Sequence, residues 1–364
     1  MSARLQNIQA LRGVAALIVL AAHIKDAELD YGGAGPILPF ALYVGVIGVD
    51  LFFLISGFVM AHVALDGSRG AGASARFLYN RAARIFPIYW AVTLCLLALY
   101  AGKQILFSEP TPFPNPVATF FLLPDDQYPL LPVGWTLVHE MFFYAVFAVF
   151  VLWRRTSLLA FLGLWAAIVM AGNIAGLVAI NPWTKVLFSP LTFEFIAGAL
   201  IAILVRRGTV KFARSALIGG GAAALAIAVA GAASLYPAAF ADPANRVAIF
   251  TPPFALMLYG AAALETKSGS VAPRWLRSVG DASYSLYLIH VPVLLVAGKL
   301  ISVSVPDGAF DNPLLVACFL AASLAAAFAL HAFVEKPALS FTRKLGGRLF
   351  RLNRAVAGAG VPAP

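Results

Sequence analysis

Charged side chains are scarce in this sequence. Only 12% of its 364 residues are Asp, Glu, Lys or Arg, whereas 61% are hydrophobic. A soluble domain carries about twice that share of charge, so the composition excludes an ordinary water-soluble globular protein. Blocks of about 17 to 25 apolar residues recur from one end to the other, and each is long enough to cross a bilayer as a helix. The sequence therefore predicts an all-α integral membrane protein that crosses the membrane many times.

Cysteine is almost absent as well. The two cysteines, Cys95 and Cys318, both lie in apolar blocks, where a thiol packs like a small hydrophobic side chain. They suggest no disulfide framework, and no residues have the spacing of metal ligands. Internal repeats and a second soluble domain are also missing. We therefore expect no metal and one membrane domain, residues 1–340, followed by a basic cytoplasmic tail, residues 341–364.

The apolar blocks predict a bundle of about ten membrane helices. Several boundaries can slip by a few residues, because glycine- and alanine-rich runs mark no sharp end. The predicted helices lie near residues 8–25, 40–64, 86–102, 132–153, 157–178, 185–205, 213–235, 246–264, 282–301 and 313–334.

The placement of positive charge tests this topology. If the N-terminus is cytoplasmic, the cytoplasmic segments hold twenty of the 26 basic residues and the outer segments hold five, with Arg12 inside the first helix. This asymmetry agrees with the positive-inside rule, so both termini are predicted to be cytoplasmic. The net charge of +10 is then explained by topology and anionic membrane lipid, and no nucleic-acid partner is required. A cleaved signal peptide is the competing interpretation of the first helix.

Two ionisable residues, Arg12 and His23, lie in the first predicted helix. They are eleven positions apart, so both leave the helix on nearly the same face, separated by roughly 16 Å along its axis. Arg12 alone could reach the cytoplasmic headgroups, and His23 alone could be a hydrogen-bonded residue between helices. Their shared face favours a common polar cavity, in which a histidine could act as a general base.

Five segments together resemble a known family. They are LQNIQALRGVAALIVLAAHI, GVIGVDLFFLISGFVMAH, RAARIFPIYW, WTLVHEMFFYAVF and VGDASYSLYLIHVPV. In this order they resemble the acyltransferase-3 family of bacterial membrane acyltransferases over roughly residues 5–340. The resemblance is greatest to stand-alone members that modify exopolysaccharides. It implies transfer of an acyl group, commonly acetyl from acetyl-CoA, to a carbohydrate hydroxyl at or beyond the outer face of the inner membrane.

The resemblance implies roles for two further sets of residues. Arg81 and Arg84, spaced i, i+3 before the third predicted helix, match the family's arginine pair, which implies contact with the phosphates of coenzyme A. Arginine suits phosphate because its planar fork donates two hydrogen bonds, although topology and lipid binding alone also explain cytoplasmic arginines. Glu140 and Tyr144 match the family's Glu-x-x-x-Tyr pattern and share a face of the fourth helix.

Helix depth predicts that Glu140 lies close to His23. Counted from opposite membrane faces, the two residues fall at similar levels, so a Glu140 carboxylate could orient the histidine and stabilise its imidazolium form. A protonated structural glutamate is the alternative, and His139 is another possible partner. Two more acidic residues inside helices, Asp50 and Glu194, are expected to line the cavity or position the acceptor. Tyr144 is expected to line the same cavity or contact the substrate.

These residues predict a membrane-bound O-acyltransferase. Arg81, Arg84 and Arg12 would hold acyl-CoA from the cytoplasm, and His23, oriented by Glu140, would deprotonate a hydroxyl of the carbohydrate acceptor. An acyl-histidine intermediate stays open, and the polysaccharide-synthesis machinery is a further possible partner. The main alternative is a secondary transporter or flippase that uses the same charged residues. A further alternative is a membrane scaffold within a polysaccharide export complex.

Overall fold

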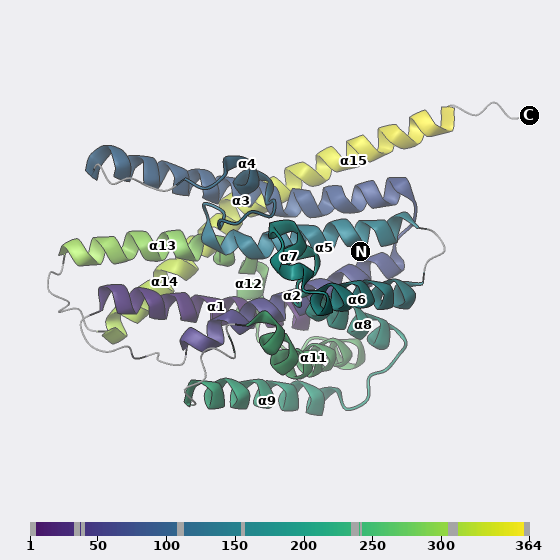
Figure 1. Cartoon of the computed structure of the whole chain (residues 1–364), viewed down its shortest axis with the longest axis horizontal. Helices are drawn as coiled ribbons and strands as arrows, with labels where there is room; N and C mark the ends of the chain where they lie inside the picture. The colour runs from purple at the N-terminus through teal and green to yellow at the C-terminus, as the bar shows by residue number, and fades with distance from the viewer. Residues whose placement is uncertain are drawn as a thin grey trace, which may run out of the picture. The chain divides into compact units, whose positions relative to one another are not determined.

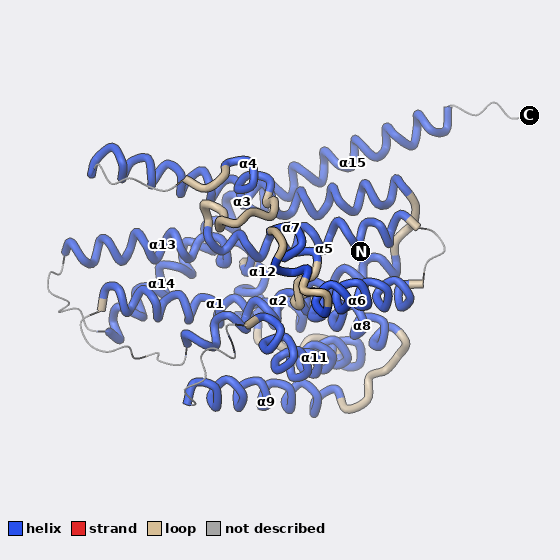
Figure 2. Tube along the Cα trace, in the orientation of Figure 1, coloured by secondary structure: helices blue, strands red, loops and turns tan. Residues whose placement is uncertain are grey.

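The computed structural model describes residues 5–32, 37, 41–107, 113–153, 157–233, 240, 242–304 and 312–359. Helices and the loops that join them make up this part of the chain, and Figure 2 shows no strand in it. The helices are α1 Gln6–Tyr31, α2 Ala41–Asp66, α3 Ala71–Phe107, α4 Pro116–Phe121, η1 Pro132–Gly134, α5 Trp135–Leu152, α6 Leu158–Ile174, η2 Leu177–Ala179, α7 Pro182–Leu187, α8 Thr192–Arg206, α9 Ala213–Ala233, α11 Pro243–Ser268, α12 Arg274–Asp281, α13 Ser283–Ser304, α14 Asn312–Leu330, η4 His331–Glu335 and α15 Lys336–Ala359.

The predicted all-α membrane fold is confirmed. Within the described ranges nine helical stretches are long and apolar enough to span a membrane, and α6, at 17 residues, corresponds to the predicted fifth helix. A length of 17 residues is at the lower limit for spanning the hydrocarbon core. The cytoplasmic location of both termini stays a prediction.

Two predicted helices differ from the structure, and the predicted domain boundary at residue 340 stays a prediction. The third helix begins at Ala71 rather than near residue 86, so Arg81 and Arg84 lie inside it. The predicted sixth helix, 185–205, is two helices, α7 and α8, separated by residues 188–191. Helix α14 continues through the π-helical turn η4 into α15, so no helix end marks the predicted boundary at residue 340. The basic tail is helical up to Ala359.

The chain forms two packed units, each described by itself. The first unit comprises Met1–Leu65 and Leu162–Phe328, and the second comprises Asp66–Phe161 and Ala329–Pro364. In the first unit α1 packs against α11, α12 and α13, and α9 runs beside α11 (Figure 1). In the second unit α3 packs against both α5 and α15.

The core of the first unit surrounds α1. Its buried members are Ala16, Leu20, Ile24, Ala27, Val279, Leu286, Leu294, Leu315, Phe319 and Ala327. Glycine allows the helices to approach closely, as small residues commonly do between membrane helices. A Cβ atom added to Gly280 of α12 would lie 1.8 Å from the Gln9 carbonyl oxygen of α1. The α1 residues of the candidate site are therefore held against α12 and α13 by backbone-level packing.

Hydrogen bonds to main-chain carbonyls hold the second unit together. The Tyr89 hydroxyl donates to the Thr119 carbonyl at 2.7 Å, and the Trp90 indole donates to the Phe120 carbonyl at 2.8 Å. These bonds fasten α4 to α3. The Tyr79 hydroxyl donates to the Thr342 carbonyl of α15 at 2.7 Å. Such bonds satisfy polar groups that the hydrocarbon core cannot hydrate.

Candidate active site

The structure places Arg12 and His23 on one uninterrupted helix, α1. The predicted spacing therefore holds: both residues lie on nearly the same face, roughly 16 Å apart along the axis. The His23 side chain is half-buried, and its Nδ1 atom lies 2.9 Å from the Val19 carbonyl oxygen. A carbonyl oxygen can only accept a hydrogen bond, so Nδ1 carries the proton. In neutral His23 the Nε2 lone pair is then available as a base.

A second histidine lies beside His23 in the first unit. His290 of α13 is 1% exposed, and the two ring centroids are 4.7 Å apart with the ring planes at 76°. The His290 Nδ1 atom lies 3.0 Å from the Leu286 carbonyl oxygen, so this ring also carries its proton on Nδ1. Its buried Nε2 atom has no hydrogen-bond partner among the described residues. Helical periodicity within one segment does not indicate this pair, because the two histidines lie on different helices.

Arg12 belongs to a polar network where α1 meets α12. Its Nη1 atom donates to the Gln9 side-chain oxygen at 3.4 Å, and the Gln9 amide donates to the Asp281 carboxylate at 2.8 Å. Arg12 is half-buried, as expected for a long side chain that extends toward water from a membrane helix. Its predicted contact with a phosphate of the donor stays a prediction.

In the second unit Glu140, Tyr144 and Arg81 form a cluster between α3 and α5. The Tyr144 hydroxyl donates to the Glu140 carboxylate, so the predicted shared face of these residues is confirmed. The Arg81 guanidinium carbon lies 5.9 Å from the centre of the Tyr144 ring and 5.6 Å from that of Phe77. Aromatic faces attract a cation in this geometry. The Arg81 Nε atom finds no hydrogen-bond partner in the described chain, and Arg84 lies one turn further along α3.

His23 and Glu140 belong to different units, and their predicted pairing stays a prediction. The described structure gives each of them another partner, Val19 for the His23 Nδ1 atom and Tyr144 for the Glu140 carboxylate. The Val19 carbonyl fixes the tautomer of His23, and a contribution of Glu140 to the orientation of His23 stays a prediction. The ring of His139 lies near those of Trp135 and Phe143.

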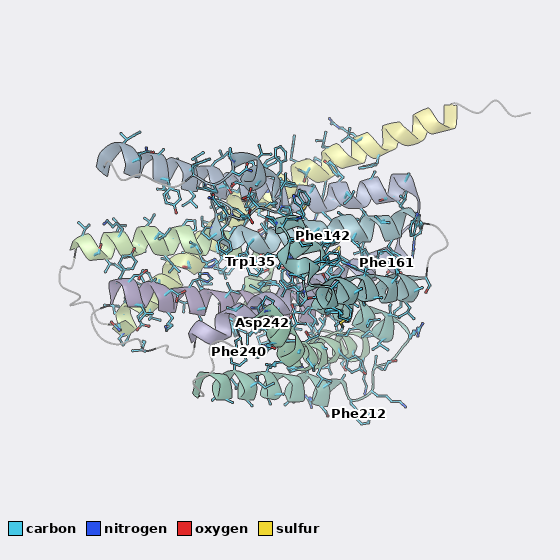
Figure 3. All side chains as sticks on the ribbon, in the orientation of Figure 1. Trp135, Phe142, Phe161, Phe212, Phe240 and Asp242 are labelled. Atoms are coloured by element: carbon cyan, nitrogen blue, oxygen red, sulfur yellow. The ribbon has the colours of Figure 1, made fainter. Side chains whose placement is uncertain are left out.

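Asp50 forms a buried ion pair that the sequence pattern did not indicate. The Nε atom of Arg246 lies 2.9 and 2.7 Å from the two carboxylate oxygens, and the side chains of Asp50 and Arg246 are 0% and 4% exposed. Arg246 also donates to the Phe240 carbonyl near the start of α11, where Figure 3 labels Phe240 and Asp242. In the predicted topology Arg246 is one of the five basic residues of the outer segments. Its sequence neighbours carry no sign of an acidic partner 196 residues away.

Glu194 lies near this ion pair in the first turn of α8. It is 0% exposed and lies beside Thr251 of α11. Asp50, Arg246 and Glu194 are therefore a buried cluster of ionisable side chains in the first unit. The predicted contact of Asp50 and Glu194 with the cavity or acceptor stays a prediction.

The residues before η1, 113–131, contain the short helix α4. Asn115 caps α4 by accepting from two main-chain N–H groups, and its amide donates to the Asp125 carboxylate at 3.1 Å. A hollow on this segment has no room for a water molecule; it is lined by Pro114, Asn115, Ala118, Thr119, Leu123, Asp125, Gln127, Tyr128 and Pro129. Residues 108–112 lie outside the described ranges. Among the residues that are described, no group of three or more His, Cys, Asp or Glu side chains could hold a metal ion.

Comparison with known proteins adds an independent finding. Residues 5–332 match the family model described as an acyltransferase domain. The chain is 31% identical to the exopolysaccharide production protein ExoZ of Rhizobium meliloti (strain 1021), over 86% of this chain and 94% of that protein. It is 27% identical to acyltransferase MdmB of Streptomyces mycarofaciens, over 99% of this chain and 96% of that protein. No solved structure matches the chain significantly.

Proposed function

Because the chain belongs to the acyltransferase-3 family and is an acyltransferase, we propose that it acylates a glycan in the bacterial inner membrane. The acyl group is acetyl, the donor is acetyl-CoA from the cytoplasm, and the acceptor is a hydroxyl of an exopolysaccharide or another cell-surface glycan. The name of the R. meliloti relative, a protein of exopolysaccharide production, supports this acceptor. The nine membrane-spanning stretches among the described residues support a multi-pass membrane protein.

The geometry of His23 carries the proposal. Its Nδ1–H is engaged by Val19, so Nε2 is the free basic atom, and the side chain is only half-buried. An imidazole held in one tautomer is a suitable general base near neutral pH. His23 removes the acceptor's hydroxyl proton at Nε2 while the hydroxyl oxygen attacks the thioester carbonyl. The C–S bond then breaks, the proton passes from Nε2 to the thiolate sulfur, and free coenzyme A and the ester leave.

Arginines hold the donor in this proposal. Arg81 and Arg84, together with Arg12, contact the phosphates of coenzyme A from the cytoplasmic side. The Nε atom of Arg81 lacks a partner among the described residues, which supports a ligand that accepts hydrogen bonds there. The pantetheine arm needs a path of roughly 16 Å to reach from the level of Arg12 to that of His23. In the alternative route, His23 Nε2 attacks the thioester carbonyl and the C–S bond breaks, which gives an acyl-histidine and the thiolate of coenzyme A. The acceptor oxygen then attacks the acyl carbon, the N–C bond breaks, and the hydroxyl proton ends on the thiolate sulfur.

The experiment compares cell-surface glycan acylation in strains that carry no copy, the wild-type chain, His23→Ala or His62→Ala. His62 is a matched control because it is also a half-buried histidine of the first unit, stacked on Phe58 outside the site. We expect acyl groups, measured by NMR and mass spectrometry at equal membrane abundance, with wild type and His62→Ala only. Full acylation by His23→Ala would contradict the mechanism, and acylation in the strain without the gene would contradict the function. Co-purification of polysaccharide-synthesis proteins with the wild-type chain tests the proposed machinery.

A further inference from the structure

We propose that Arg277 binds the 3′-phosphate of acetyl-CoA and makes the enzyme prefer this donor over its dephosphorylated form. The inference rests on the proposed function and deepens it, because nothing else assigns Arg277 a part. Coenzyme A carries a diphosphate next to the pantetheine arm and a 3′-phosphate on the ribose beyond it. The proposed function places Arg12 at the phosphates of the donor but gives the 3′-phosphate no residue of its own.

Arg277 lies on helix α12, where that helix packs against α1. Its Nη1 atom donates to the Gln6 side-chain oxygen. One turn further along α12, Asp281 accepts from the Gln9 amide, and the Gln9 side-chain oxygen accepts from Arg12. These side chains form one polar seam between α1 and α12, and two guanidinium groups belong to it.

The order of these groups along α1 matches the order of the groups in the donor. Gln6, Arg12 and His23 follow one another from the end of α1 that the predicted topology places in the cytoplasm. Gln6, which marks the level of Arg277, is roughly 9 Å from Arg12 along the axis, and Arg12 is roughly 16 Å from His23. With the thioester at His23 and the diphosphate at Arg12, the ribose and its 3′-phosphate come next, at the level of Arg277.

One edge of the Arg277 guanidinium suits a phosphate. The contact with Gln6 is made by Nη1, which does not belong to the edge that Nε and Nη2 form. On that edge the Nε atom has no hydrogen-bond partner among the described residues, and such orphaned donors are uncommon in proteins. A phosphate can accept two parallel hydrogen bonds from an arginine edge. The side chain is half-buried and therefore keeps part of its surface in solvent.

The charges around Arg277 also favour an anionic ligand. Gln6 is neutral, so the acceptor at Nη1 does not balance the positive charge of Arg277. Asp281 accepts from a glutamine amide of α1. The Glu265 carboxylate accepts from the main-chain N–H groups of Gln6 and Asn7. Both carboxylates are thus engaged by groups other than Arg277, and the 3′-phosphate supplies its counter-charge.

The test compares acetyl-CoA with acetyl-3′-dephospho-CoA as donors for the full-length protein in membranes that contain the natural acceptor. The donors differ only in the 3′-phosphate, so the ratio of their kcat/KM values reports contact with that group. This ratio does not depend on the amount of folded enzyme. The variants are Arg277→Gln, which removes the charge, and Arg277→Lys, which retains the charge without the planar fork. Arg214→Gln is the matched control, because Arg214 is an exposed arginine of α9 in the same unit.

We expect wild type and Arg214→Gln to prefer acetyl-CoA about 10- to 100-fold, mostly through KM, which is the range that a charge-assisted hydrogen bond gives. Arg277→Gln should lose this preference, because its kcat/KM falls for acetyl-CoA and stays unchanged for the dephosphorylated donor. Arg277→Lys should keep part of the preference. A purely structural role of Arg277 would instead lower kcat/KM for both donors by the same factor.

Three results would overturn the inference. If wild type uses both donors equally well, the enzyme does not recognise the 3′-phosphate, although the proposed function stands. If Arg277→Gln keeps the wild-type preference, whether or not its activity falls, Arg277 does not bind that phosphate. If wild type transfers acetyl from neither donor to any glycan fraction, the proposed function fails and the inference fails with it, and the wild-type reaction separates this result from the other two.

Discussion

Replacing Asp50 by Asn should destabilise the protein strongly, because it leaves the buried Arg246 without its counter-ion. Arg246 is 4% exposed, and both of its close contacts at Nε are to Asp50, at 2.9 and 2.7 Å. Breaking a buried ion pair from one side costs about 3–5 kcal/mol of the free energy of unfolding. A guanidinium cannot avoid this cost, since it keeps its proton in proteins.

The opposite change, Arg246→Met, should cost less. It leaves Asp50 and Glu194 as buried carboxyls, and each can take up a proton and become neutral. We expect a loss of about 1–3 kcal/mol, the cost of buried polar groups without partners. The double change Asp50→Asn with Arg246→Met should recover most of the stability, because removing a buried pair together is often nearly neutral. The structure thus predicts an asymmetric and strongly non-additive cycle.

The assay is unfolding of the purified protein by SDS titration in mixed micelles, which yields a free energy for the wild-type chain, the two single variants and the double variant. A coupling energy of about 2 kcal/mol or more would support the reasoning. Glu194→Gln is the matched control, because it replaces a neighbouring buried carboxyl group by an amide of similar size and leaves both members of the Asp50–Arg246 pair in place, and it should change the free energy by less than about 1 kcal/mol. Additive single effects, or a stable Asp50→Asn variant, would refute the buried ion pair as the source of stability.

Two further predictions follow from single contacts. Gly280→Ala should lower the amount of folded protein severely, because its Cβ would lie 1.8 Å from the Gln9 carbonyl oxygen. Gly221→Ala should be tolerated, because no atom lies within 4 Å of its added Cβ. Detergent size-exclusion profiles of the two variants measure the folded protein, and equal profiles would contradict the close approach of α1 and α12. Arg81→Lys should raise KM for acetyl-CoA about tenfold at unchanged protein abundance, because lysine retains the charge but loses the planar fork. Steady-state kinetics measure this KM, and an unchanged KM would contradict the assignment of Arg81 to the donor site.

Much of the fold could be predicted from the chain alone, because a bilayer imposes strict demands on sequence. Apolar blocks of spanning length predicted the nine spanning stretches and the shorter helix α6 of the described residues, and the family motifs predicted an acyltransferase. The helix edges were less predictable. Hydropathy detects only the part of a helix that lies in the hydrocarbon core. Helix α3 begins at Ala71, several turns before its most apolar part, because polar residues form the same helical main-chain hydrogen bonds as apolar ones.

The sequence by itself determined which residues share a face of one helix. The Arg12 and His23 spacing on α1 and the Glu140 and Tyr144 contact on α5 follow from 3.6 residues per turn, and both are found in the structure. Only the tertiary structure decided which residues meet across helices, such as His23 with His290 and Asp50 with Arg246. The physical reason is that helical periodicity predicts the direction of a side chain, whereas its neighbour depends on packing between segments far apart in the chain.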